Sequence, residues 1–236
     1  MSDMPQIPQL NYDVLARILP GAYGVMAVSL ALDTNAGSAL AATLGTSKAA
    51  SESATILLVF LLMAAYITGL ALSLIGDSLQ KLLTQLAPSY FNMLGEILRD
   101  QHHQPASVQN RVMTILKEEC TMGMDDVPPG FLEKLIILWY DRLRLQSNDF
   151  LSRLTRLRAE YRMYGSLAVA SYAAAVLHAA KSLRLGESPD PLLLVVSMAA
   201  GLLFTWGMAR SYRYFQTSII NHYCGEVAKA REEARL

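Results

Sequence analysis

The residues best suited to metal chemistry are few and scattered along the chain. His102 and His103 lie together in a polar segment, between Gln101 and Gln104. A zinc site would need further nitrogen, sulfur or carboxylate ligands from elsewhere in the fold. The residues that folding could bring to the histidines are Glu118, Glu119, Cys120, His222 and Cys224. Their spacing specifies no metal, so we interpret the two histidines as solvated loop residues and predict neither a metal nor another cofactor.

Catalytic motifs are also missing from the sequence. It contains no His-Glu-x-x-His pattern, no glycine-rich phosphate loop and no nucleophile elbow. Cys120 and Cys224 are the only cysteines, too few for a disulfide framework, and we expect both to be reduced thiols. We therefore predict that the protein is not an enzyme, and we assign no catalytic residue.

Composition separates this chain from ordinary soluble proteins. Of its 236 residues, 53% are hydrophobic and 17% are charged, whereas soluble domains have about 45–50% apolar and about 25% charged residues. The 20 basic and 20 acidic residues give a formal net charge of zero, so no overall positive field indicates nucleic acid as a partner. The composition indicates the lipid bilayer instead.

Four uncharged segments are predicted to cross the membrane as helices. A bilayer core about 30 Å thick needs roughly 20 apolar residues in a helix. Residues 53–76 and 191–209 meet this requirement, and the alanine-rich segment 163–180 comes close to it. The first segment, 18–32, follows directly on Arg17 and has only fifteen residues. That length also suits a buried helix of a soluble protein or a re-entrant segment.

The basic residues are distributed unequally about these spans. If both termini lie on one side, that side holds seventeen of the twenty Lys and Arg residues, and only Lys48, Lys181 and Arg184 lie on the other. Basic residues next to membrane spans stay on the cytoplasmic side. We therefore predict a protein of the cell membrane, specifically the bacterial inner membrane, with both termini and residues 77–162 in the cytoplasm.

Together these features predict an all-α integral membrane protein with four transmembrane helices in two hairpins. The N-terminal segment and the first hairpin take residues 1–76. A helical cytosolic domain, 77–162, is inserted between spans 2 and 3, because its apolar residues recur at helical spacing. The second hairpin takes 163–209, and a cytosolic C-terminal helix or tail takes 210–236.

One helix is predicted to join the cytosolic domain to the third span. From Phe131 onward the apolar residues keep a helical period into the span, as far as about residue 181. A continuous or gently kinked helix of that length would measure roughly 75 Å. It would either transmit displacement between cytosol and bilayer or serve as inert scaffolding.

Arginines gather at the cytoplasmic ends of the third and fourth spans. The lipid- or anion-contact candidates are Arg153, Arg156, Arg158, Arg162, Arg210 and Arg213. Such residues fix the orientation of the spans and pair with headgroup phosphates, a contribution of about 1 kcal/mol each near an anionic leaflet. The cluster before the third span could instead bind an anionic ligand such as a nucleotide messenger. Its position beside a span favours lipid.

Small residues form a strip along the third span. The helix-packing candidates are Ser166, Ala170, Ser171, Ala174, Ala175 and Ala179. Small side chains let membrane helices approach closely, so the strip predicts a partner helix from the same chain or from another copy. His178 is the candidate ionisable residue within a span, and it shares a helical face with Lys181. Both snorkelling to the interface and a role in conduction fit this position.

Two functional hypotheses follow from this architecture. The first is a homo-oligomeric membrane protein that couples its cytosolic helical domain to the bilayer as a channel-like or membrane-perturbing effector, in bacterial stress or defence. The second is a non-conducting membrane anchor or receptor that recruits a cytosolic partner protein through residues 77–162. The four short spans and the small-residue strip favour the first hypothesis.

Overall fold

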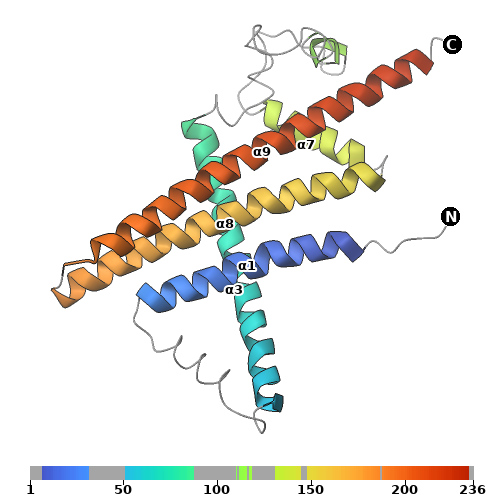
Figure 1. Ribbon diagram of the computed structural model, residues 1–236. Coiled ribbons are helices and arrows are strands. Elements are labelled where there is room, and N and C mark those ends of the chain that lie inside the picture. The colour runs from blue at the N-terminus through green and yellow to red at the C-terminus, as the bar shows by residue number, and fades with distance from the viewer. Residues whose placement is uncertain are drawn as a thin grey trace. The chain divides into compact units, whose positions relative to one another are not determined.

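The computed structural model describes residues 7–31, 51–87, 110, 112–115, 117–118, 131–144, 148–186 and 188–233 (Figure 1). Its long helices are α1 (Ile7–Ala31), α3 (Ser51–Leu86), α7 (Phe131–Arg144), α8 (Asn148–Leu185) and α9 (Pro191–Glu233). No strand occurs among the described residues. The predicted all-α class is therefore confirmed for this part of the chain.

Three of these helices are long and apolar enough to cross a membrane. The segments concerned are Leu58–Leu86 in α3, Arg153–Leu185 in α8 and Pro191–Ala230 in α9. They include the second, third and fourth predicted spans, apart from the first few residues of the second. The first predicted span overlaps a shorter apolar helix, Val14–Ser29. These helices are compatible with a membrane protein, and the four-span threading with its cytosolic insertion stays a prediction.

The chain divides into two compact units. The first unit consists of Met1–Lys81 and Ala159–Met208, and the second consists of Leu82–Arg158 and Ala209–Leu236. Helices α3, α8 and α9 each contribute residues to both units. The sequence predicts the inserted domain and the C-terminal segment as separate parts, whereas the structure groups most of both in the second unit.

Within the first unit, α1 and α3 cross at glycines. A Cβ atom added at Gly21 would collide with the backbone carbonyl oxygen of Ala65, and one added at Gly69 would collide with that of Arg17. Only a residue without a side chain lets the two backbones come this close. The crossing therefore fixes which residues of α1 lie beside which residues of α3.

Helix α8 packs into the same unit through its small residues. A Cβ atom added at Gly76 of α3 would lie 3.0 Å from the backbone carbon of Gly165 of α8. The predicted small-residue strip continues from this contact, and five of its members are buried, with exposed fractions from 0 to 4%: Ser166, Ala170, Ser171, Ala174 and Ala175. Helices within the same chain thus cover most of the strip.

The outer surface of the first unit is strongly apolar. Large side chains such as Phe60 and Leu74 of α3 and Leu192 and Leu202 of α9 are exposed. In the most apolar part of α3 only 11% of the residues are buried inside the protein, and in α9 only 17%. Surfaces of this kind are unusual on soluble proteins and normal where lipid surrounds a helix.

The turn between α8 and α9 is closed by local hydrogen bonds. Gly186 adopts a φ of 70° and ends α8, a conformation that glycine tolerates best. Asp190 caps α9, because its Oδ1 accepts a 2.9 Å hydrogen bond from the backbone N–H of Leu192. Pro191 at the first helical position has no N–H to leave unsatisfied. Helices α8 and α9 are thus separate, as the two predicted spans within 163–209 require.

In the second unit, α7 packs against the C-terminal part of α9 (Figure 1). The ring of Trp139 stacks on that of Tyr223, with centroids 4.7 Å apart, and Trp139 is completely buried. The Tyr223 hydroxyl accepts a 2.6 Å hydrogen bond from Nη1 of Arg142. Tyr140 meets Phe215 in a second aromatic pair at 5.6 Å.

The predicted continuous helix from residue 131 to 181 is wrong, because the chain reverses between α7 and α8. The guanidinium carbon of Arg158 lies 5.6 Å from the ring centroid of Tyr140, whereas one straight helix would hold these two residues about 27 Å apart. Residues 145–147, between the two helices, lie outside the described part. Helix α8 begins at Asn148, a residue type that favours a helix cap over a helix interior.

We predict that Gly21→Ala and Gly69→Ala each destabilise the first unit. The added methyl group meets backbone atoms that cannot move aside, so we expect a loss of about 1–3 kcal/mol in the free energy of unfolding. Gly225→Ala is the matched control, since nothing lies within 4 Å of its added Cβ, and it should be neutral or gain roughly 0.5–1 kcal/mol. Denaturant titration of the detergent-solubilised protein measures these changes. Equal effects at all three sites would contradict the close crossing.

We also predict that Trp139→Ala costs the second unit about 3–5 kcal/mol, because it removes a fully buried aromatic side chain and leaves a cavity. Trp206→Ala serves as the control, since Trp206 is 53% exposed. Its replacement should change the unfolding free energy by less than half as much. A similar loss for both variants would show that α7 does not depend on the Trp139 contact.

Candidate functional site: a cation inside the apolar unit

The first unit holds a cation at the crossing of α1 and α3. Nη1 of Arg17 donates a 2.7 Å hydrogen bond to the hydroxyl of Tyr66. The guanidinium carbon also lies 5.7 Å from the centroid of the Tyr66 ring, within the range of a cation–π contact. The glycine contacts at Gly21 and Gly69 bring the two helices close enough for this pair to form.

Helix α3 places this pair far from its polar ends. Tyr66 lies thirteen residues after Ser53 and ten before Gly76 in the uncharged stretch 53–76, which corresponds to about 20 Å and about 15 Å of helix. Arg17 is the eleventh of the 25 residues of α1. The guanidinium is therefore held beside the middle of the apolar stretch of α3.

The sequence pattern instead predicts that Arg17 is the polar residue just before the first span. The helix in fact begins at Ile7, ten residues earlier, and passes through Arg17 without a break. A count of uncharged residues stops at the first arginine, although a long side chain can bridge to a polar group on another helix. The available signal was Tyr66, the one tyrosine of the uncharged stretch 53–76, which lies near its centre.

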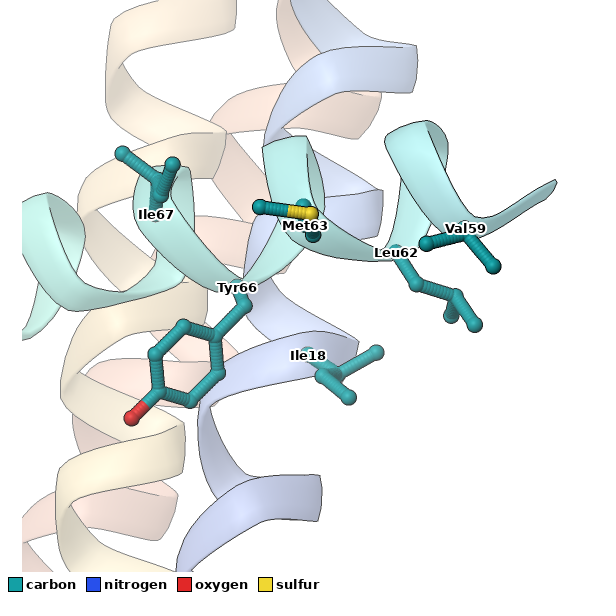
Figure 2. A pocket seen from close by; sticks show the side chains of 6 residues that line it. All are labelled: Ile18, Val59, Leu62, Met63, Tyr66 and Ile67. Carbon is teal, nitrogen blue, oxygen red and sulfur yellow. The ribbon is translucent and has the colours of Figure 1, made fainter. Parts of the chain in front are cut away.

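An open groove between α1 and α3 has Tyr66 in its wall (Figure 2). Its walls are formed by Ile18 of α1 and by Val59, Leu62, Met63, Tyr66 and Ile67 of α3, and its volume is about 270 Å³. Tyr66 belongs both to the groove and to the pair, so the cation and the apolar walls adjoin each other.

Two further hydrogen bonds connect helices inside the first unit. Tyr23 of α1 and Ser171 of α8 have their hydroxyl oxygens 3.0 Å apart, as do Tyr172 of α8 and Thr205 of α9. The single proton of Ser171 is donated to the carbonyl of Leu167 at 2.9 Å, and that of Thr205 to its own helix at 2.8 Å. A hydroxyl has one proton to donate. While Ser171 and Thr205 donate to their own helices, the tyrosines are the donors between helices, and either oxygen of each pair can take that role.

Among the arginine candidates, Arg158 and Arg162 contact groups of the protein itself. Nη2 of Arg162 lies 3.6 Å from Oδ2 of Asp77 of α3, with side chains 29% and 36% exposed. Ion pairs with this exposure contribute little to stability. Arg158 lies over the Tyr140 ring, so these two arginines are partly engaged within the chain.

Three of the other four arginine candidates are exposed. Arg153 and Arg156 are exposed on α8. Arg210 is exposed on α9 and lies over the ring of Tyr214, 5.6 Å from its centroid. Arg213 is half-buried. Contact of these residues with lipid or an anionic ligand stays a prediction.

His178 has a structural position at the end of the helical hairpin. Its Nε2 accepts a 3.1 Å hydrogen bond from the backbone N–H of Asp190, in the turn before α9. Lys181 and Ala179, its neighbours on α8, are half-buried. The structure thus places His178 where it can hold the turn, and a role in conduction stays untested.

The residues weighed as metal ligands are not brought together in the described part of the chain. His102, His103 and Cys120 lie outside the described residues, whereas Cys224 is a buried thiol on α9 that forms no disulfide. Among the described residues, no group of three or more His, Cys, Asp or Glu side chains could hold a metal ion.

No protein family model, curated protein or solved structure matches this chain. The function is therefore argued from the geometry of the first and second units.

We predict that the hydrogen bond between Tyr172 and Thr205 stabilises the first unit by about 0.6 kcal/mol, the average for such bonds between membrane helices. A double-mutant cycle with Tyr172→Phe and Thr205→Val isolates this energy from the effects of each substitution alone. Unfolding in mixed detergent micelles provides the four stabilities. A coupling energy of zero would contradict a stabilising hydrogen bond between Tyr172 and Thr205.

Proposed function

We propose that this protein is an integral membrane protein that acts on the bilayer itself, as a channel-like or membrane-perturbing effector. The observation that carries the proposal is the position of Arg17, hydrogen-bonded to Tyr66 in the middle of the apolar stretch of α3. Ionisable residues within membrane spans are rare, and they mark ion pathways and other functional sites.

A cation at this depth has a direct effect on the surrounding lipid. Placing an arginine at the centre of a membrane helix costs about 2.5–3.5 kcal/mol on insertion scales, and the membrane lowers this cost by local thinning and by drawing in water. Both responses make a bilayer more permeable to ions. Arg17 would thus weaken the permeability barrier next to the helix pair that carries it.

The path for ions would run outside the helix bundle of one chain. Small residues of α8, including Ser166 and Ala170, are buried against the other helices of the first unit, and they fill its interior. The groove beside Tyr66 lies instead on the open side of α1 and α3. We expect the perturbed lipid on that side.

The protein would still self-associate, but through the open side of α1 and α3 and not through the small-residue strip of α8. Helices of the same chain cover most of the small-residue strip, so the strip is taken up within the monomer. Copies that meet at the open side of α1 and α3 would place several Arg17 side chains around one path. The second unit, which contains most of the predicted cytosolic residues 77–162, would supply the signal.

One observation favours the second hypothesis, a non-conducting anchor for a cytosolic protein. Helix α7 exposes two neighbouring large apolar side chains, Ile137 at 56% and Leu138 at 46%. Exposed apolar residues on a soluble face can mark a protein-binding surface. An anchor of this kind would bind a stoichiometric partner through α7 and leave the bilayer intact.

We predict that liposomes containing the full-length protein leak ions and that Arg17→Gln reduces the flux at least about tenfold, the equivalent of about 1.4 kcal/mol in barrier height. Gln keeps a hydrogen-bond donor for Tyr66 but removes the charge. Arg17→Lys should retain most of the flux, and Arg184→Gln, at an exposed position at the end of α8, should retain all of it. A fluorescent ion indicator inside the vesicles provides the measurement.

Tight liposomes with the wild-type protein would contradict the proposal. Recovery of a stoichiometric soluble protein from native membranes, together with its loss in Ile137→Asp, would then establish the anchor.

A further inference from the structure

We infer that α7 pairs with α7 of a second copy of this chain, antiparallel and about a twofold axis that passes between Ile137 and Leu138. The pairing rests on the self-association in the proposed function and adds to it a contact surface in the second unit. The two copies would bury their exposed apolar side chains against each other and join the flanking charges in two ion pairs.

Helix α7 has two different faces. One face is apolar and buried within the second unit, with exposed fractions from 0 to 4%: Leu135, Ile136, Trp139 and Leu143. The other face is exposed and holds residues that are three, four and seven positions apart: Lys134, Ile137, Leu138 and Asp141. That spacing puts them in one row along the helix. The row has two apolar residues at its centre, 56% and 46% exposed, and one charge of opposite sign at each end.

This row is complementary to itself when it is reversed. In an antiparallel pair, Ile137 of each copy faces Leu138 of the other, and Lys134 of each copy faces Asp141 of the other. A twofold axis makes every contact occur twice, so four residues give two apolar contacts and two ion pairs. A parallel pair would instead set like charges against each other. The pattern therefore favours a second copy of this chain, in one orientation, over an unrelated protein.

The two charges are not placed to stabilise α7 itself. Lys134 lies in the first turn of the helix and Asp141 in the last, the reverse of what the helix dipole favours. They are seven residues apart, about 10 Å along the helix, which is too far for them to pair with each other. Within the part of the chain that the structure describes, neither forms an ion pair. A second copy supplies the opposite charge at both positions.

The direction of α7 suits two copies in one membrane. Trp139 stacks on Tyr223 of α9. Its neighbour Tyr140 contacts Phe215 instead, eight residues earlier and about 12 Å away along α9. Adjacent residues reach such distant positions because α7 crosses α9, as Figure 1 shows. Since α9 contains the fourth predicted span, copies inserted in the same direction can pair their α7 helices antiparallel about an axis along the bilayer normal.

Charge reversal in the full-length protein tests the pairing, with self-association measured by analytical ultracentrifugation in detergent micelles. Lys134→Asp and Asp141→Lys should each weaken self-association at least about tenfold, because each sets like charges together at two contacts. The variant with both changes should regain the wild-type affinity. Rescue within one chain is excluded by the distance between the two residues, and the helix dipole favours both substitutions, so neither should unfold α7.

A mixture of the two single variants is a stricter test. Each variant alone sets like charges together, whereas one copy of each restores both ion pairs, so we expect a heterodimer. Lys229→Asp and Glu226→Lys reverse charges at exposed positions on α9 and should leave self-association unchanged. Leu138→Ala should weaken it, and Leu82→Ala is the matched control, at a 51% exposed position in the same unit.

Three results would overturn the pairing. The first is a monomeric wild-type protein, or a dimer that the single charge reversals do not weaken. The second is weakening without rescue in the double variant and in the mixture. The third is a stoichiometric soluble protein that binds the monomer and is lost in Leu138→Ala. Ion flux is a separate result: tight liposomes together with charge rescue would refute only the proposed function, and leaking liposomes without rescue would refute only the pairing.

Discussion

The hydrogen bond between Arg17 and Tyr66 is the interaction on which the functional interpretation depends. An arginine beside the middle of an apolar helix is expensive, and it persists only where neighbouring groups or lipid compensate its charge. Tyr66 supplies part of that compensation, through its hydroxyl and its ring. The adjoining groove then determines what approaches from outside. Tyr66 bonds the cation, lies near the middle of the apolar stretch of α3 and lines the groove, so these three features form one site.

The helix contacts around this site leave little freedom for it to shift. The glycines at the α1–α3 crossing allow backbone contact, and any side chain there would push Arg17 away from Tyr66. Tyr23 and Tyr172 then tie α8 to α1 and to α9 through hydrogen bonds to the hydroxyl groups of Ser171 and Thr205. Small residues and tyrosines thus provide the specificity that apolar contacts alone do not give inside a lipid environment.

Sequence reasoning predicted the helices better than the contacts between them. Uncharged runs such as 53–76 and 191–209 identify long apolar helices, because length and hydrophobicity are local properties. The reversal between α7 and α8 was missed because an apolar period can continue through a turn, and only the Arg158–Tyr140 contact reveals it. The Arg17–Tyr66 pair was missed because its partners are 49 residues apart, and no local pattern links them. The small-residue strip predicts that a partner helix covers Ser166 and Ala170. It does not predict that this helix belongs to the same chain, as the structure shows.

The depth of the Arg17–Tyr66 pair in a bilayer is the most direct test of this interpretation. A spin label at Met63→Cys, one turn from Tyr66, would be placed in a protein with both native cysteines replaced and reconstituted in liposomes. Its accessibility to oxygen and to a water-soluble nickel complex reports depth. We predict high oxygen and low nickel accessibility, as at the centre of the hydrocarbon. Nickel accessibility equal to that of a label at Ser78, an exposed residue just beyond the apolar stretch, would contradict the central claim.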